Sequence, residues 1–100
     1  MIIVAGKAKL APGAGAKLAD ALRTLIAETR KEKGCIDYSV GADAVEADTF
    51  VISEMWESVD ALKAHMGTPH MAAWLKAVGA AGAVSTSIRF FEAGNEIKMG

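Results

Sequence analysis

The sequence lacks several features that would assign it to a familiar class of protein. Its only cysteine is Cys35, so no internal disulfide can form, and we expect a chain that works in the reducing cytoplasm. No apolar run approaches the roughly 20 residues that cross a membrane. The first ten residues, MIIVAGKAKL, have no basic segment before their apolar residues, so we expect no signal peptide.

An excess of charge of either sign is also missing. The sequence holds 11 Lys and Arg against 12 Asp and Glu, for a net charge of −1, and its basic residues form no stripe. Neither a nucleic acid nor an anionic membrane surface is therefore an expected partner, because both are bound by clustered positive charge. A length of 100 residues fits a single domain, residues 1–100, which buries only a modest core by itself.

Hydrophobic periodicity predicts alternating strands and helices. Apolar residues alternate in the strands and recur every three or four residues in the helices. Ser58 and Thr68 are predicted to cap helices, Pro69 suits a first helical position, and Gly34 suits the left-handed residue after a helix. The predicted strands cover 2–10, 35–41, 49–57 and 84–91, and the predicted helices cover 14–33, 59–66 and 69–78, with a turn at 42–48, a break at 79–83 and a loose tail after 94.

This order predicts a ferredoxin-like α+β fold, a four-stranded antiparallel sheet with helices on one face. The third strand is apolar on both sides, since Phe50 and Trp56 alternate with Val51 and Met55. A sheet that is apolar on both faces is normally covered on both. We therefore predict a homodimer in which two sheets pair as a dimeric α+β barrel.

The segment EMWESVDALKAHMGTPH, residues 54–70, holds one Trp and both His. A metal site is not expected there, because His65 and His70 are five residues apart and only Glu57 or Asp60 is near enough in sequence to be a third ligand. The motifs of hydrolase nucleophiles and phosphate-binding loops are also absent from the sequence.

An acid–base site or ordinary packing remains. Glu54 shares an apolar strand face with Trp56, where a carboxylate is costly unless it has a partner. His65 lies beside an apolar helix stripe and could accept a proton near neutral pH, whereas His70, in a first helical turn, is better suited to hydrogen bonding. Each of these residues also suits a surface or core position.

Three aromatic side chains complete the set of candidate site residues. Trp56 and Trp74 could be core residues or the walls of a pocket. Tyr38 lies in an alternating strand pattern, and its hydroxyl would need a partner if it were buried.

The sequence resembles the antibiotic biosynthesis monooxygenase domain family, and within it the small bacterial quinol monooxygenases. The resemblance covers nearly the whole chain and is most specific in E-x-W-E-S at 54–58 and A-H-x-x-T-P-H at 64–70. It implies a dimeric α+β barrel with a cavity between sheet and helices. It also implies oxygenation of a phenol or hydroquinone by molecular oxygen, without flavin, haem or metal.

In the chemistry that the resemblance implies, His65 and Glu54 would be the catalytic residues, with His65 as the base and Glu54 as a group that orients the substrate. Trp56 and Trp74 would be the aromatic walls, and Tyr38 and His70 would contact or orient the substrate. The haem-degrading relatives carry an Asn on the first strand, where this sequence has Gly6 and Lys7, so haem degradation is not expected. Relatives that isomerise a phosphorylated, sugar-derived signal carry a similar H-x-x-T-P-H segment. A small-molecule isomerase or a non-enzymatic binding protein is therefore the alternative.

Overall fold

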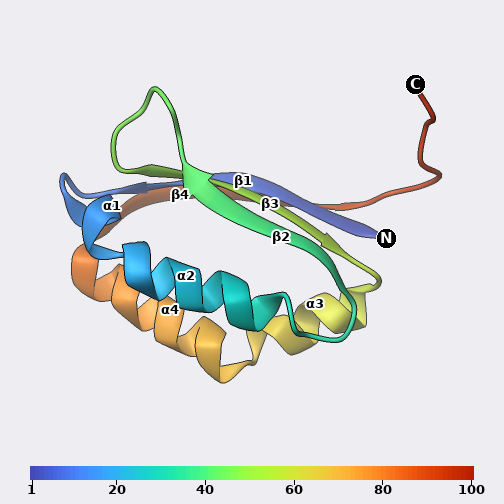
Figure 1. Ribbon diagram of the computed structural model, residues 1–100, viewed down its shortest axis with the longest axis horizontal. Helices are drawn as coiled ribbons and strands as arrows, with labels where there is room; N and C mark the ends of the chain where they lie inside the picture. Colours follow the sequence, from blue (N-terminus) through green and yellow to red (C-terminus); the bar gives the residue numbers. More distant parts are fainter.

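The computed structural model describes residues 1–100, and its strands form one antiparallel sheet in the order β2-β3-β1-β4. All helices lie on one face of this sheet (Figure 1), which confirms the predicted ferredoxin-like α+β fold. The elements, in chain order, are β1 (Ile2–Leu10), α1 (Ala14–Lys17), α2 (Ala19–Thr29), β2 (Cys35–Ala42), β3 (Thr49–Trp56), α3 (Val59–Met66), α4 (Pro69–Ala81) and β4 (Ala83–Glu92).

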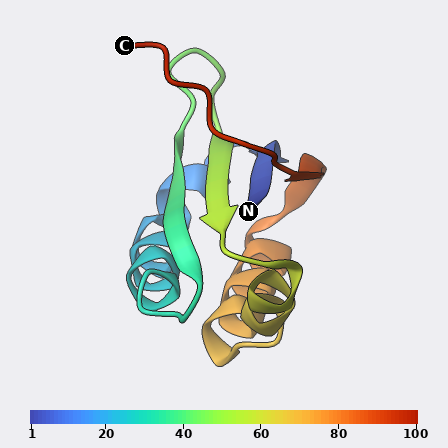
Figure 2. The ribbon, with the colours of Figure 1, turned by 90° about the vertical axis from the view of Figure 1, so that its right-hand side faces the viewer.

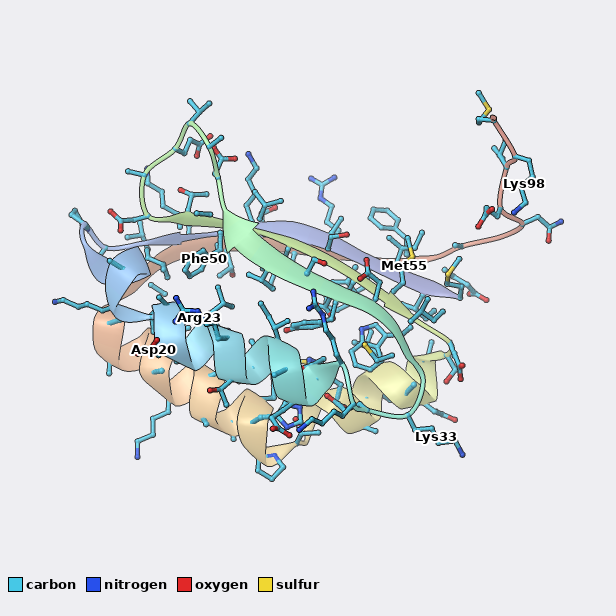
Figure 3. All side chains as sticks on the ribbon, viewed as in Figure 1. Asp20, Arg23, Lys33, Phe50, Met55 and Lys98 are labelled. Carbon is cyan, nitrogen blue, oxygen red and sulfur yellow. The ribbon has the colours of Figure 1, made fainter.

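The core lies between the sheet and the helices. Alternate residues of the two central strands point inward, among them Val4 of β1 and Phe50 and Trp56 of β3, and they meet Leu25 of α2. Phe50 is visible in this layer, below the sheet (Figure 3). Turned by 90°, the structure shows α2 beneath the β2 edge and α3 and α4 beneath the β1–β4 side (Figure 2). The helices thus form two groups, with space for side chains between them and the sheet.

The single helix predicted over 14–33 is wrong in two places. The chain forms α1 and α2, which meet at Leu18, and α2 ends at Thr29. After Thr29, the amides of Lys31 and Glu32 bond to carbonyls three residues back, so the helix gives way to tight turns. Gly34 then adopts the predicted left-handed conformation, with φ of 87°. These turns place Glu32 outside the helix.

The predicted break at 79–83 is also wrong, because α4 continues to Ala81. Gly79 and Ala80 remain helical, and only Gly82 leaves the helix, with φ of 97°. Its amide still bonds to the carbonyl of Val78, which closes the last turn. A single glycine with positive φ is enough to turn the chain from α4 into β4.

The β4 strand forms one edge of the sheet, and all ten of its residues are exposed. Phe90 and Phe91 are each more than half exposed, and Val51 on the helix-free face of β3 is 39% exposed. After β4 the tail leads away from the sheet and ends beyond Lys98 (Figures 1 and 3). None of the helices combines the length and the apolar character needed to cross a membrane.

Candidate active site

The turn between α3 and α4 brings both histidines together. Ser58 caps α3 by accepting a hydrogen bond from the amide of Ala61, as predicted. Thr68 caps α4 by accepting from the amide of Met71, and its hydroxyl also donates to the carbonyl of His65 at 2.8 Å. One hydroxyl therefore joins the end of one helix to the start of the next. The rings of His65 and His70 lie 6.1 Å apart as a result.

Glu32 joins the two histidines from the turn that follows α2. Its Oε2 lies 2.7 Å from Nδ1 of His65 and 2.8 Å from Nε2 of His70. The side chain of His65 is 1% exposed, whereas those of Glu32 and His70 are 14% and 17% exposed. The group is thus a small buried network with one side near solvent. Glu57 and Asp60, the third ligands considered from the sequence, are not part of it.

Two imidazoles and a carboxylate also form a donor set that zinc accepts. The ligand atoms of a tetrahedral zinc ion, each bonded at 2.0–2.1 Å, lie roughly 3.3 Å from one another. Here the carboxylate oxygen lies 2.7 and 2.8 Å from the two nitrogens, which are hydrogen-bond separations. The carboxylate oxygen would have to move away from both nitrogens to bind a metal ion together with them, and the present geometry is that of a shared hydrogen-bond acceptor.

The ring of His65 packs against two aromatic side chains from the sheet. Its centroid lies 4.8 Å from that of Trp56 and 5.3 Å from that of Tyr38. Trp56 is fully buried and Tyr38 is 3% exposed. The three rings form an aromatic layer between the Glu32 network and the centre of the sheet.

Glu54 lies on the other side of this aromatic layer. Its Oε1 accepts a 2.9 Å hydrogen bond from the indole nitrogen of Trp56, and the residue is 8% exposed. Burial raises the pKa of Glu54 above its ordinary value. The Trp56 hydrogen bond and nearby His65 act in the opposite direction. Burial, reinforced by the charge of Glu54, also raises the pKa of Tyr38. No hydrogen bond joins the Tyr38 hydroxyl to another group of the protein.

Glu54 and Tyr38 border a cavity of about 120 Å³ between the sheet and α4. An engineered cavity of about 150 Å³ binds benzene, so this space is the size of one aromatic ring. Thr86 is the only other polar residue in its wall. The remaining wall is apolar and consists of Ala8, Leu10, Val40, Phe50, Ile52, Met71, Trp74, Leu75, Val78 and Ile88. A larger hollow of about 500 Å³, between α2 and the β2–β3 loop, is more open to solvent.

The structure thus divides the residues predicted for the site into two groups. Tyr38, Glu54 and Trp74 border the cavity. Trp56, His65 and His70 do not border it, although Trp56 bonds to Glu54 and His65 packs against Tyr38. Glu32 was missed because it lies 33 and 38 residues before its histidine partners, in a turn that resembles a charged helix end. Nothing in the local sequence KEKG marks it as a site residue.

Residues 1–77 match the model of the family described as antibiotic biosynthesis monooxygenase. The chain belongs to this family. The Escherichia coli K12 protein named "Probable quinol monooxygenase YgiN" is 32% identical over 88 residues, with 78% of this chain and 85% of that protein covered. An uncharacterised Synechocystis protein, sll1783, is 36% identical over 69 residues. That match spans 69% of this chain but only 47%, about half, of the Synechocystis protein.

Solved structures support membership in the antibiotic biosynthesis monooxygenase family. A crystal structure from Deinococcus radiodurans, described with the same family name, superposes with a TM-score of 0.90 at 27% sequence identity. The superposition covers 100% of this chain and 99% of that one. The resemblance drawn from the two short motifs in 54–70 is therefore confirmed at the level of family and fold.

Proposed function

We propose that this protein is a cofactor-independent monooxygenase that oxidises a phenol or hydroquinone with molecular oxygen in the cavity beside Glu54. One observation carries the proposal: a buried carboxylate, the only one in the wall, lies in an apolar cavity the size of one aromatic ring. The name of the Escherichia coli relative supports a quinol as the substrate class.

Glu54 is the group best placed to take the substrate's proton. Its Oε1 is held by Trp56, which leaves Oε2 for a phenolic hydroxyl. A raised pKa makes this carboxylate a stronger base than an ordinary glutamate, and general bases work best when their pKa lies near the working pH. The Tyr38 hydroxyl, without a partner in the protein, can bond to the same substrate oxygen. The base role predicted for His65 stays a prediction, and that ring does not border the cavity.

The reaction needs no further redox partner. After Glu54 removes the phenolic proton, the phenolate gives one electron to oxygen, and the resulting superoxide and phenoxyl radical combine at a ring carbon. The peroxide takes up the proton from Glu54. Loss of the hydrogen on that carbon, with cleavage of the O–O bond, then yields a carbonyl and water. All four electrons that reduce O2 to the new carbonyl oxygen and to water come from the substrate, and one oxygen atom becomes bonded to a ring carbon.

The apolar wall contributes by holding the ring and excluding water. Trp74 lies against Phe50, with centroids 6.2 Å apart, and both border the cavity. A dry, shaped site favours recombination of the radical pair at one carbon and keeps the radicals away from solvent.

We also propose that the protein works as a homodimer. Thr86 and Ile88 of β4 line the cavity, yet every residue of that edge strand is exposed. A second copy that covers the helix-free face and this edge would bury the exposed Phe91 and Val51. It would also close the side of the cavity that β4 forms.

The proposal is tested by oxygen uptake with a panel of reduced quinones in metal-free buffer, after subtraction of autoxidation. We expect enzyme-dependent uptake that is largely lost in Glu54→Gln, which keeps the shape and the Trp56 hydrogen bond but cannot accept the proton. His65→Ala measures separately whether His65 is needed. Uptake that survives in Glu54→Gln would reject this assignment of the base. A complete absence of uptake would favour an isomerase or a binding protein.

A further inference from the structure

His65 is anchored through one of its two ring nitrogens. Nδ1 lies 2.7 Å from Oε2 of Glu32, and the two nitrogens of an imidazole point in roughly opposite directions, so Nε2 points away from Glu32. The side chain of His65 is 1% exposed, so the ring is held in one orientation inside the protein.

We propose that Glu32 is a positioning residue: it fixes the proton of neutral His65 on Nδ1 and holds the ring against Trp56, so that Nε2 stays unprotonated and the indole N–H stays directed at Glu54. Its importance for turnover rests on the proposed function of Glu54. The geometric claim, that Glu32 sets the tautomer, does not depend on that function.

The hydrogen bonds at Glu32 determine where the protons lie. An ionised carboxylate only accepts hydrogen bonds, so each nitrogen that contacts Oε2 must carry a hydrogen. His65 therefore carries its proton on Nδ1, and His70 carries its proton on Nε2. The ring of His65 also packs against Trp56 of β3 and Tyr38 of β2.

The contacts then continue in one direction toward the cavity. Glu32 anchors His65, whose ring lies 4.8 Å from Trp56 at an interplanar angle of 34°. Trp56 in turn donates its indole N–H to Glu54 at 2.9 Å. If His65 turned, its Nδ1–H would lose the Glu32 acceptor and the packing against Trp56 would change. A residue outside the cavity thereby fixes the orientation of the carboxylate inside it.

Nitrogen-15 NMR of the histidine rings tests this directly, at a pH where both rings are neutral. In the unaltered protein we expect His65 to show a protonated Nδ1 and an unprotonated Nε2. Glu32→Ala removes the acceptor and should shift His65 toward the Nε2–H tautomer. Two controls should keep the Nδ1–H form: Glu32→Gln, whose amide oxygen still accepts, and His70→Ala, which leaves the Glu32–His65 bond intact.

An Nε2–H tautomer in the unaltered protein would overturn the proposal, and so would a tautomer that is unchanged in Glu32→Ala. The spectrum of the unaltered protein tests the tautomer even if Glu32→Ala fails to fold. Kinetics distinguish this proposal from the proposed function. The expected tautomers without any oxygen uptake would reject the proposed function alone. Oxygen uptake whose kcat is the same in Glu32→Ala and the unaltered protein would reject the positioning role alone.

Discussion

The indole nitrogen of Trp56 donates a hydrogen bond to Oε1 of Glu54, two residues earlier on the same strand. Side chains two apart on a strand point to the same face, so the carboxylate and the indole are buried side by side. Each satisfies a polar atom of the other that would otherwise be left unpaired in the core. The pair therefore explains how a strand in the middle of the sheet holds an acidic side chain on its buried face.

Replacing Trp56 with Phe is expected to raise the pKa of Glu54 further, because the hydrogen bond that stabilises the ionised form is lost. Loss of this bond and of buried volume should cost about 1–3 kcal/mol of stability. Trp74→Phe is the matched control, since Trp74 borders the same cavity without bonding to Glu54. NMR titration of the Glu54 carboxyl measures the expected rise in its pKa, and an unchanged pKa in Trp56→Phe would contradict the expectation.

Glu54→Gln is expected to stabilise the protein at neutral pH. The pKa of Glu54 is higher in the folded state than the ordinary value of about 4.3, so the folded protein binds this proton more tightly than the unfolded chain. The stability that Glu54 gains from holding this proton is fully present below the unfolded-state pKa, and it is lost as the pH rises through the folded-state pKa. Urea unfolding between about pH 4 and pH 8 measures the difference between the two proteins. A difference that does not change with pH would contradict the expectation.

Gly34→Ala is expected to destabilise the protein by more than about 1 kcal/mol. Gly34 has φ of 87°, and an added Cβ would lie 2.6 Å from the Cβ of Ala61 on α3. Gly79→Ala is the control, because Gly79 is helical and an added Cβ meets nothing within 4 Å. That change should stabilise α4 by about 0.5–1 kcal/mol. Thermal unfolding of both variants should therefore shift in opposite directions.

Thr29→Val is expected to stabilise the protein by about 1 kcal/mol. Thr29 is fully buried at the end of α2, and its hydroxyl has no hydrogen-bond partner. Valine keeps the shape and removes the unpaired oxygen, with little change in helix propensity. Thr49→Val should have the opposite effect, since the Thr49 hydroxyl donates to the carbonyl of Ala47. Equal losses of stability in both variants would show that the Thr29 hydroxyl has a partner in solution.

The sequence predicted local features of the fold well. The structure confirms the helix caps at Ser58 and Thr68 and the left-handed conformation of Gly34. Each cap depends on a single hydroxyl, and the conformation of Gly34 depends on its lack of a side chain. The errors fell where tertiary contacts compete with propensity. At the first helix, the Asp48 carboxylate accepts hydrogen bonds from the amides of Gly13 and Gly15, which ties the helix start to a distant loop.

Part of the candidate site was also predictable, because it depends on a local sequence pattern. Period-two alternation placed Glu54 beside Trp56, and their hydrogen bond follows from that. Glu32 was not predictable, because its contacts with His65 and His70 depend on where the turn after α2 meets the α3–α4 turn. No periodicity spans such a distance in the sequence. The network that anchors His65 therefore emerged only in three dimensions.

The cavity wall combines side chains of the sheet with side chains of α4. The polar side chains Tyr38 and Glu54 come from the adjacent strands β2 and β3, whereas Met71, Leu75 and Val78 come from α4. Substitutions along that helix can therefore reshape the space offered to a ligand while the carboxylate and its indole partner stay in place. Related proteins with this fold can therefore accept different substrates while they keep the same chemistry. A library aimed at new substrates should randomise the cavity-lining positions of α4.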